Sequence, residues 1–223
     1  MQTHKLYAIW AVLLSTTMVI SMITAQKIMP VGYFSISAAN IIFPFAYIIS
    51  DLVTEVYGFK KSRKIIWLGL FSMVLASMVF QIIIMLPSIP EWQNQEAFVQ
   101  VLGQTPRIVI ASSLAYLCGE FANSIIVSKM KVRSEGKFIS LRVLVSSIVA
   151  HIIDSVVFVC IAFYGTYHAS VILQIITSET VVKFGIECVL MPITILLIVW
   201  VKKTEKIDTY DRGIRYSIFS LHG

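Results

Sequence analysis

Five acidic side chains lie within stretches that are otherwise apolar enough to cross a membrane: Asp51, Glu55, Glu120, Asp154 and Glu187. A carboxylate at bilayer depth is costly unless it faces a protein interior or a wet cavity, so such residues often mark the path of a substrate, ion or proton. The sequence contains no Walker A, HExxH or GxSxG motif and no nucleophile–base pair. We therefore do not expect an enzyme, and we expect neither a cofactor nor a bound metal.

Four of these stretches place their polar residues on one helical face, at steps of three or four positions. A bundle that turned the four faces inward would enclose a polar cavity within apolar packing. The faces consist of Tyr47 and Asp51, with Glu55 one turn beyond; Tyr116, Glu120 and Asn123; His151 and Asp154; and Glu179, Lys183 and Glu187.

Depth along the helix separates Asp51 and Glu55 from the other carboxylates. Asp51 precedes Gly58 by seven residues and so lies about 10 Å from the end of its helix, with Glu55 nearer still. For these two, gating or proton coupling and plain ion pairing with the basic residues 60–64 are equally open. The remaining carboxylates have no nearby loop cations, which favours a binding role, although Lys183 could serve only to neutralise its neighbours.

The composition indicates a polytopic membrane protein rather than a soluble one. The chain is 57% hydrophobic and only 13% charged, about half the charged share of a soluble domain. Spans of about 20 mostly apolar residues predict an all-α membrane protein with one domain, residues 1–201, and a polar tail, residues 202–223. The six predicted spans are about 6–25, 36–57, 65–87, 107–130, 143–165 and 180–201.

The basic residues predict the orientation of this bundle. If the N-terminus is cytoplasmic, fifteen of the 18 Lys and Arg residues fall on the inner side, leaving only Lys27, Arg107 and Lys183 in the outer half. This is a strong positive-inside bias. It predicts a multi-pass protein of the cytoplasmic (inner) cell membrane with both termini, and the tail, in the cytoplasm. The net charge of +6 is thereby explained without a nucleic-acid partner.

Two outer connections carry a signal of their own. Residues 87–106 contain enough polar and aromatic side chains to include an interfacial helix, and residues 168–178 are typical of an amphipathic piece lying on the membrane. Either could form a lid or act as an interfacial anchor. The tail is expected to be at most partly ordered.

Four blocks in the second, fourth, fifth and sixth spans follow one another at consistent separations. They are FPFAYIISDLVTEVYGFKKSRK (43–64), RIVIASSLAYLCGEFANSIIVSKMK (107–131), RVLVSSIVAHIIDSVVF (142–158) and VKFGIECVLMPIT (182–194). Together they resemble the vitamin-uptake-transporter-like family of queuosine precursor transporters. The resemblance implies a six-helix importer of 7-cyano- or 7-aminomethyl-7-deazaguanine, or of queuine, for salvage into tRNA modification. It also implies a fold similar to the substrate-binding subunits of energy-coupling-factor transporters.

The residues that match the family's motifs include most of the polar faces. A departure lies just before Asp154, where relatives often carry Gln or Asn and this chain has Ala150 and His151. We predict a substrate-binding set and a gating or proton-coupling set. The first comprises Tyr47, Tyr116, Glu120, Asn123, Asp154, Lys183 and Glu187, and the second comprises Asp51, Glu55, Arg107 and His151.

A deazaguanine base suits these side chains chemically. Its N1–H and exocyclic amine can both donate to one carboxylate, and its O6 can accept from Lys or Asn. We therefore hypothesise that Glu187, Asp154 or Glu120 accepts from the guanine-like edge, with Lys183 near the carbonyl. The base could stack on Tyr47, Tyr116 or Phe158.

Several alternatives remain open at this stage. The chain could be the binding subunit of an ATP-driven energy-coupling-factor complex, or it could import another small vitamin-like heterocycle. A membrane enzyme and a structural scaffold fit the buried carboxylates less well. Besides the small-molecule ligand, the expected partners are membrane lipid and either a second copy of the chain or an energising ATPase module. The energy source is open between proton coupling, facilitated entry and ATP.

Overall fold

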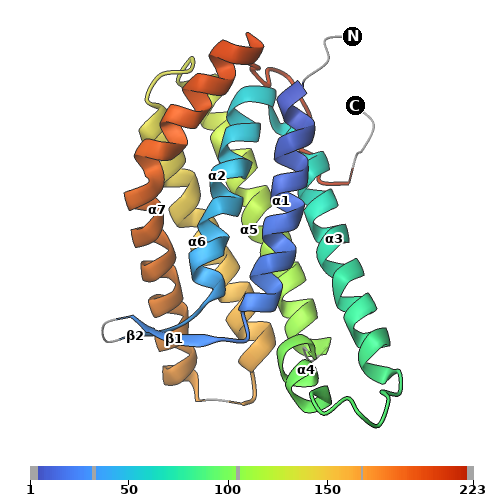
Figure 1. Cartoon of the computed structure of the whole chain (residues 1–223). Coiled ribbons are helices and arrows are strands. Elements are labelled where there is room, and N and C mark those ends of the chain that lie inside the picture. Colours follow the sequence, from blue (N-terminus) through green and yellow to red (C-terminus); the bar gives the residue numbers. More distant parts are fainter. Residues whose placement is uncertain (1–4, 32–33, 104–105, 167, 220–223) are drawn as a thin grey trace.

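The computed structural model describes residues 5–31, 34–103, 106–166 and 168–219. Six long helices run roughly alongside one another in an elongated bundle (Figure 1). Each is long and apolar enough to cross a membrane, which confirms the prediction of a helical membrane protein with six spans. They are α1 (Lys5–Thr24), α2 (Ala39–Tyr57), α3 (Phe59–Met85), α5 (Pro106–Arg133), α6 (Ile139–Phe163) and α7 (Ala169–Glu205).

The two ends of the bundle differ in what they carry (Figure 1). The start of α1, the reversal at Gly58, the α5–α6 connection and the tail after α7 lie together at one end, called here the termini end. The opposite end carries a β-hairpin and the short helix α4 and is called the hairpin end. The even number of spans places the start of α1 and the tail at the same end.

The hairpin joins α1 to α2. Strands β1 (Ile28–Val31) and β2 (Phe34–Ser37) pair antiparallel, with Ile28 opposite Ser37 and Val31 opposite Phe34. The hydroxyl of Ser37 donates to the carbonyl of Ala25 at 3.0 Å and so ties the hairpin back to the end of α1. The sequence analysis did not predict these strands, although the apolar–polar alternation of residues 34–37 is a strand signal.

The two connections that were predicted to lie on the outer side turn out differently from each other. The first contains α4 (Gln95–Leu102), as predicted. The second does not form a separate amphipathic piece, because residues 169–178 are the first turns of the 37-residue helix α7. Neither Gly nor Pro occurs in residues 169–184, so nothing in the local sequence ends the helix. A helix of this length extends about 55 Å and exceeds the apolar thickness of a bilayer.

Helix α2 is the most buried of the six spans. Its apolar side chains, including Leu52, Val53 and Val56, pack in the main core with residues of α1, α3 and α5. Three hydroxyls join α2 to α3 and α5, because Thr54 donates to Ser62 at 2.8 Å and lies 3.1 Å from Ser124. The outward faces of α1, α3 and α7 carry exposed apolar side chains, as lipid-facing helices do.

A single glycine makes the reversal between α2 and α3. Gly58 has φ of +82°, a conformation that residues with a Cβ adopt only at a cost. Its amide donates to the carbonyl of Thr54 and ends α2, and α3 begins at the next residue. The amide of Phe59 donates to the Asp211 carboxylate at 2.7 Å, so an acidic side chain from the tail caps the positive end of α3.

The tail is more ordered than the sequence suggested. Residues 207–218 fold back over the termini end, where the amide of Thr209 donates to the carbonyl of Val56 at 3.1 Å. Further along, Arg63 and Trp67 of α3 donate to the tail carbonyls of Ser217 and Ile218. These backbone contacts and the apolar side chains between them hold the tail down, which a reading of its polar composition alone could not show.

The space above Gly58 generates a test of the tail's role. A Cβ on Gly58 would lie 2.8 Å from a carboxylate oxygen of Asp211, whereas a Cβ on Gly165, where φ is +80°, would meet nothing within 4 Å. We expect both Gly→Ala variants to lose about 1 kcal/mol of stability from the positive φ. Only Gly58→Ala should also loosen the tail, which thermal unfolding in detergent and limited trypsin cleavage at Arg212 would report. Equal stability and equal cleavage in the two variants would contradict this account.

Candidate functional site

The four predicted polar faces meet inside the bundle. Helices α2, α5, α6 and α7 together place eight polar side chains in one region, called here the central cluster. All of them are buried, none more than 7% exposed. The members are Tyr47 and Asp51 of α2, Glu120 and Asn123 of α5, His151 and Asp154 of α6, and Lys183 and Glu187 of α7.

Lys183 is paired across two helices. Its ammonium lies 2.8 Å from the carboxylate of Asp154 on α6 and 2.8 Å from that of Glu179, one turn earlier on α7. It also lies 5.5 Å from the centre of the Phe43 ring. The lysine therefore neutralises Glu179, as the sequence allowed, but its second partner is Asp154 rather than Glu187.

Glu187 has different partners on α6. One of its oxygens accepts from the hydroxyl of Ser147, and the other lies 2.5 Å from Nε2 of His151. The His151 ring in turn packs edge-on against Tyr47, with ring centres 4.5 Å apart. His151 thus joins an acid on α7 to an aromatic ring on α2.

Asp51 belongs to the central cluster rather than to the end of its helix. One oxygen accepts from the amide of Asn123 at 2.6 Å, and the other has no partner among the described residues. Its closest charged neighbours include Glu187 and Glu120. The basic residues 60–64 do not pair with it in the described part of the chain.

Glu120 stands apart because nothing in the described structure neutralises it. Its side chain is fully buried, at 0% exposure, and neither carboxyl oxygen has a hydrogen-bond partner among the described residues. The hydroxyl of Ser50 lies nearby, and the charged neighbours of Glu120 are the acids Asp51, Asp154 and Glu187. An unpaired acid in such a place is costly and needs an explanation.

A glycine allows the cluster to be this dense. A Cβ at Gly119 would lie 3.1 Å from Cβ of Asp154 and 3.2 Å from the hydroxyl of Tyr47. A side chain at this position would therefore require Asp154 and Tyr47 to shift. Gly119 immediately precedes Glu120, so the close approach sets the position of that carboxylate.

Two predicted site residues lie elsewhere. The hydroxyl of Tyr116 donates to the carbonyl of Ile66 on α3 at 3.1 Å, so it tethers α5 to α3. Arg107 donates to the carbonyls of Ile161 and Tyr164 and so satisfies the end of α6. Thirteen residues separate Arg107 from Glu120, which places it about 20 Å along α5 from the cluster.

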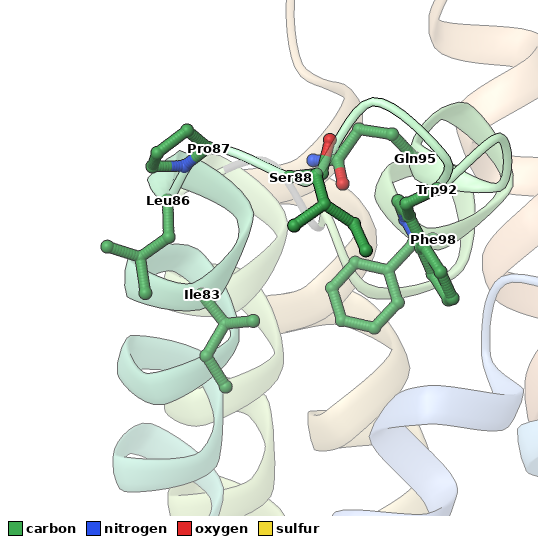
Figure 2. A pocket seen from close by; sticks show the side chains of 8 residues that line it. Ile83, Leu86, Pro87, Ser88, Trp92, Gln95 and Phe98 are labelled. Carbon is green, nitrogen blue, oxygen red and sulfur yellow. The ribbon is translucent and has the colours of Figure 1, made fainter.

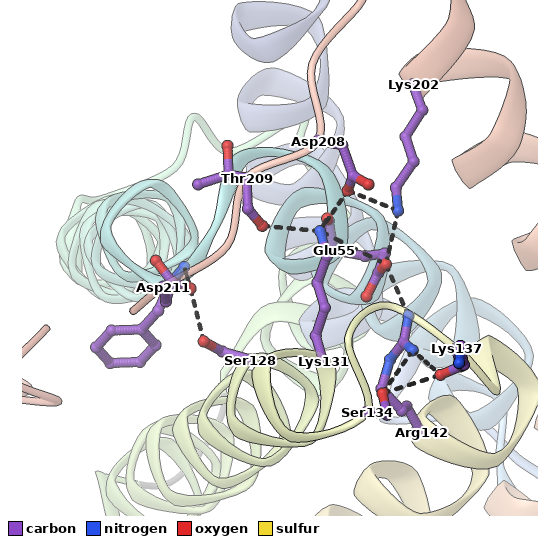
Figure 3. A network of polar contacts seen from close by, with 11 residues as sticks. Glu55, Ser128, Lys131, Ser134, Lys137, Arg142, Lys202, Asp208, Thr209 and Asp211 are labelled. Atoms are coloured by element: carbon purple, nitrogen blue, oxygen red, sulfur yellow. Dashed lines mark hydrogen bonds and ion pairs between the residues drawn. The ribbon is translucent and has the colours of Figure 1, made fainter. Parts of the chain in front are cut away.

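Glu55 forms a second network, at the termini end (Figure 3). One of its oxygens lies 2.8 Å from Arg142 of α6 and 2.7 Å from Lys202 of α7. Lys131 of α5 donates to the Glu55 backbone carbonyl. Glu55 is therefore ion-paired, which was one of the two alternatives predicted for it. Its partners come from three other helices and not from residues 60–64.

The tail completes this second network. Asp208 pairs with both Lys131 and Lys202, at 2.5 and 2.8 Å. Partial burial alone would raise the pKa of Asp208, but the hydrogen bonds and charges of the two lysines hold it below its ordinary value. Nearby, Asp211 accepts from Ser128 at 2.6 Å as well as capping α3. Figure 3 shows the tail lying across the ends of the helices that supply the basic groups.

A hollow that the predictions did not concern lies at the hairpin end. Its volume is about 320 Å³, and it is formed where α3 meets the connection to α4 (Figure 2). Its walls are apolar and aromatic, with only Ser88, Trp92 and Gln95 offering polar atoms. None of its lining residues is charged and none belongs to a predicted site, so it lacks the chemistry of the central cluster.

Several residues that complete the two networks were not in the predicted sets. Ser147 shares the polar face of His151 in the sequence, and Phe43 lies one turn before Tyr47, so helical spacing was the available signal for both. Nothing in the sequence could pair Asp208 with Lys131 and Lys202, because the three are brought together by the path of the tail. In the described part of the chain, no group of three or more His, Cys, Asp or Glu side chains is arranged to hold a metal ion.

Comparison with known proteins gives consistent matches. A family model described as "Putative vitamin uptake transporter" matches residues 37–197. A "Probable queuosine precursor transporter" of Bacillus subtilis (strain 168) is 25% identical over 170 residues, covering 75% of this chain and 74% of the relative. A protein of the same description from Haemophilus influenzae is 28% identical over 89 residues, or 40% of this chain and 37% of its own. No solved structure matches the chain significantly.

The Glu55 network predicts a large loss of stability when its acid is neutralised. The Glu55→Gln substitution keeps the shape but leaves the buried Arg142 without its charged partner, which costs about 3–5 kcal/mol. The matched control is Glu135→Gln, an exposed acid at the same end of the bundle. Thermal unfolding of the purified proteins should show a clear loss for the first and almost none for the second. A small and equal effect would mean that the network contributes little.

Because the pKa of Asp208 is lowered in the folded state, the attachment of the tail should weaken at low pH. A carboxylate that is more acidic in the folded state stabilises that state above its ordinary pKa of 3.8, and the contribution is lost as the pH falls through the folded value. A fluorophore attached to the tail, which can be read at acidic pH where trypsin is inactive, should detect release of the tail below about pH 4. Asp208→Asn should loosen the tail at neutral pH and remove this step. A tail that stays bound in the variant would argue against the role of Asp208.

Proposed function

Because this chain belongs to the vitamin uptake transporter family, a family of multi-pass membrane proteins, we propose that it imports queuosine precursors. The proposed substrates are 7-cyano- and 7-aminomethyl-7-deazaguanine, with queuine as a further candidate, for salvage into tRNA modification. Relatives from two bacteria that are described as probable queuosine precursor transporters support this proposal. So does the chemistry of the central cluster.

The observation that carries the proposal is the buried pair formed by Asp154 and Lys183, 2.8 Å apart. A guanine-like edge presents two adjacent donors and one acceptor, which a carboxylate and an ammonium together complement. We place the N1–H and exocyclic amine on Asp154 and O6 near Lys183. Tyr47 and Phe43, both close to the pair, offer rings on which the base can stack.

Glu187 and His151 supply the remaining polar wall of this proposed site. Their 2.5 Å contact links the ligand region to Tyr47, and a protonatable imidazole there could carry a proton through the cluster. Asn123 and Asp51 face it from the other helices. The ligand would thus be held near mid-membrane between four helices, as alternating access requires.

The same side chains argue that this conformation is closed. A ligand cannot reach groups that are so little exposed without movement of the surrounding helices. We propose that the termini end faces the cytoplasm, since most Lys and Arg residues gather there. The Glu55 network would then be the inner gate, where ion pairs between α2, α5, α6 and α7 must break for the ligand to leave.

A direct test replaces the acids of the proposed site. Uptake of radiolabelled 7-aminomethyl-7-deazaguanine into liposomes that contain only this protein should fall at least about tenfold in Asp154→Ala, which removes the proposed acceptor of the guanine-like edge, and in Glu187→Ala, which leaves the buried His151 without its carboxylate partner. The control Glu96→Gln, an exposed acid on α4, should transport normally at matched protein levels. Unchanged uptake in both Ala variants would remove the proposed site.

The same liposomes address the alternative of an ATP-driven complex. Uptake by the isolated chain would show that it needs no energising module. If binding is normal but uptake requires a co-purifying ATPase, the chain is the binding subunit of such a complex. In that case the substrate proposal stands and the solitary mode of transport fails.

A further inference from the structure

The central cluster has more acids than bases. Four carboxylates, those of Asp51, Glu120, Asp154 and Glu187, are buried together with only Lys183 and His151. Lys183 is also shared with a fifth acid, Glu179. Even with His151 charged, at least two negative charges in the cluster remain without a basic partner. Buried net charge of this size is costly at membrane depth.

The contacts show which carboxylate carries the excess negative charge. Asp154 has its lysine and Glu187 has its histidine and Ser147. Asp51 has at least the amide of Asn123. Glu120 alone has no cation, and neither of its oxygens has a hydrogen-bond partner of good geometry among the described residues, although the hydroxyl of Ser50 lies nearby. It is therefore the acid that still has a place for a cation.

The surroundings of Glu120 fix what that cation can be. On α2 it is faced by Tyr47, Ser50 and Asp51, on α6 by Asp154 and on α7 by Glu187. Tyr116 is its neighbour on α5. A hard metal ion would need several oxygens in contact around it, and the described chain contains no group of three or more His, Cys, Asp or Glu side chains that could hold one. A single hydrogen-bonding cation, an alkylammonium or a proton, suits one carboxylate that has no basic partner.

We propose that Glu120 receives the positively charged side chain of the ligand, so that the site prefers a deazaguanine bearing an ammonium group over a neutral one. This inference rests on the proposed function and deepens it. The pair Asp154–Lys183 holds the guanine-like edge common to all precursors, and Glu120 binds the substituent at position 7, in which they differ. When no cationic ligand is bound, protons cancel the excess charge, and the ammonium replaces one of them on Glu120.

Three ligands separate charge from shape. They are 7-aminomethyl-7-deazaguanine, which is cationic at neutral pH, its neutral isostere 7-hydroxymethyl-7-deazaguanine, and the neutral 7-cyano compound. Calorimetric titration of the purified protein at pH 7 should give the amine an affinity at least about tenfold higher than either neutral ligand, as a charged pair does over a neutral contact. Lowering the pH should weaken only the amine, since protons compete with it.

The variant Glu120→Gln keeps the size of the side chain and removes its charge. The ratio of affinities, amine over hydroxymethyl, should fall to about one, with the larger change on the amine. The control Glu96→Gln should keep the wild-type ratio. Equal affinities of the amine and its isostere in the wild type, which needs no variant to fold, would overturn the inference and leave the proposed function intact. Failure of all three ligands to bind would overturn the proposed function itself.

Discussion

The cost of placing a carboxylate inside an apolar span governs this structure. Glu55 shows how the cost is met, because its buried acid draws Arg142 from α6 and Lys202 from α7 to one point. Lys131 from α5 joins them at the backbone of the same residue. Removing one charged partner of such a buried group destabilises a protein far more than replacing the whole group by apolar residues. The helices that meet at the termini end are consequently held in one arrangement relative to α2.

The central cluster meets the same cost less completely. Its ion pairs run between α6 and α7, while α2 and α5 contribute Asp51 and Glu120, whose oxygens are only partly satisfied. A fully paired core would be stable but would have nothing left to offer a ligand. The contrast suggests that the Glu55 network holds the bundle together, whereas the central cluster is completed by a bound ligand.

The length of the apolar stretches was sufficient to predict the spans, and helix periodicity was sufficient to predict most of the cluster. Tyr47 and Asp51, or Lys183 and Glu187, are one helical turn apart, so a polar face is visible within each span. Periodicity says nothing about which faces meet, and so it could not show that Lys183 turns to Asp154 or that Tyr116 turns to the backbone of α3. It also failed for the tail and the start of α7, where contacts distant in sequence, or the absence of a helix breaker, decide the outcome.

The cap of α3 has a consequence for how the protein is made. The acid that satisfies Phe59 is Asp211, which is synthesised only after the residues of all six spans. During insertion the second and third helices therefore wait with an unfinished junction at Gly58. The junction closes only when the tail arrives, so this part of the fold is completed after the last span has been made, and a nascent chain interrupted before Asp211 would keep an open helix end.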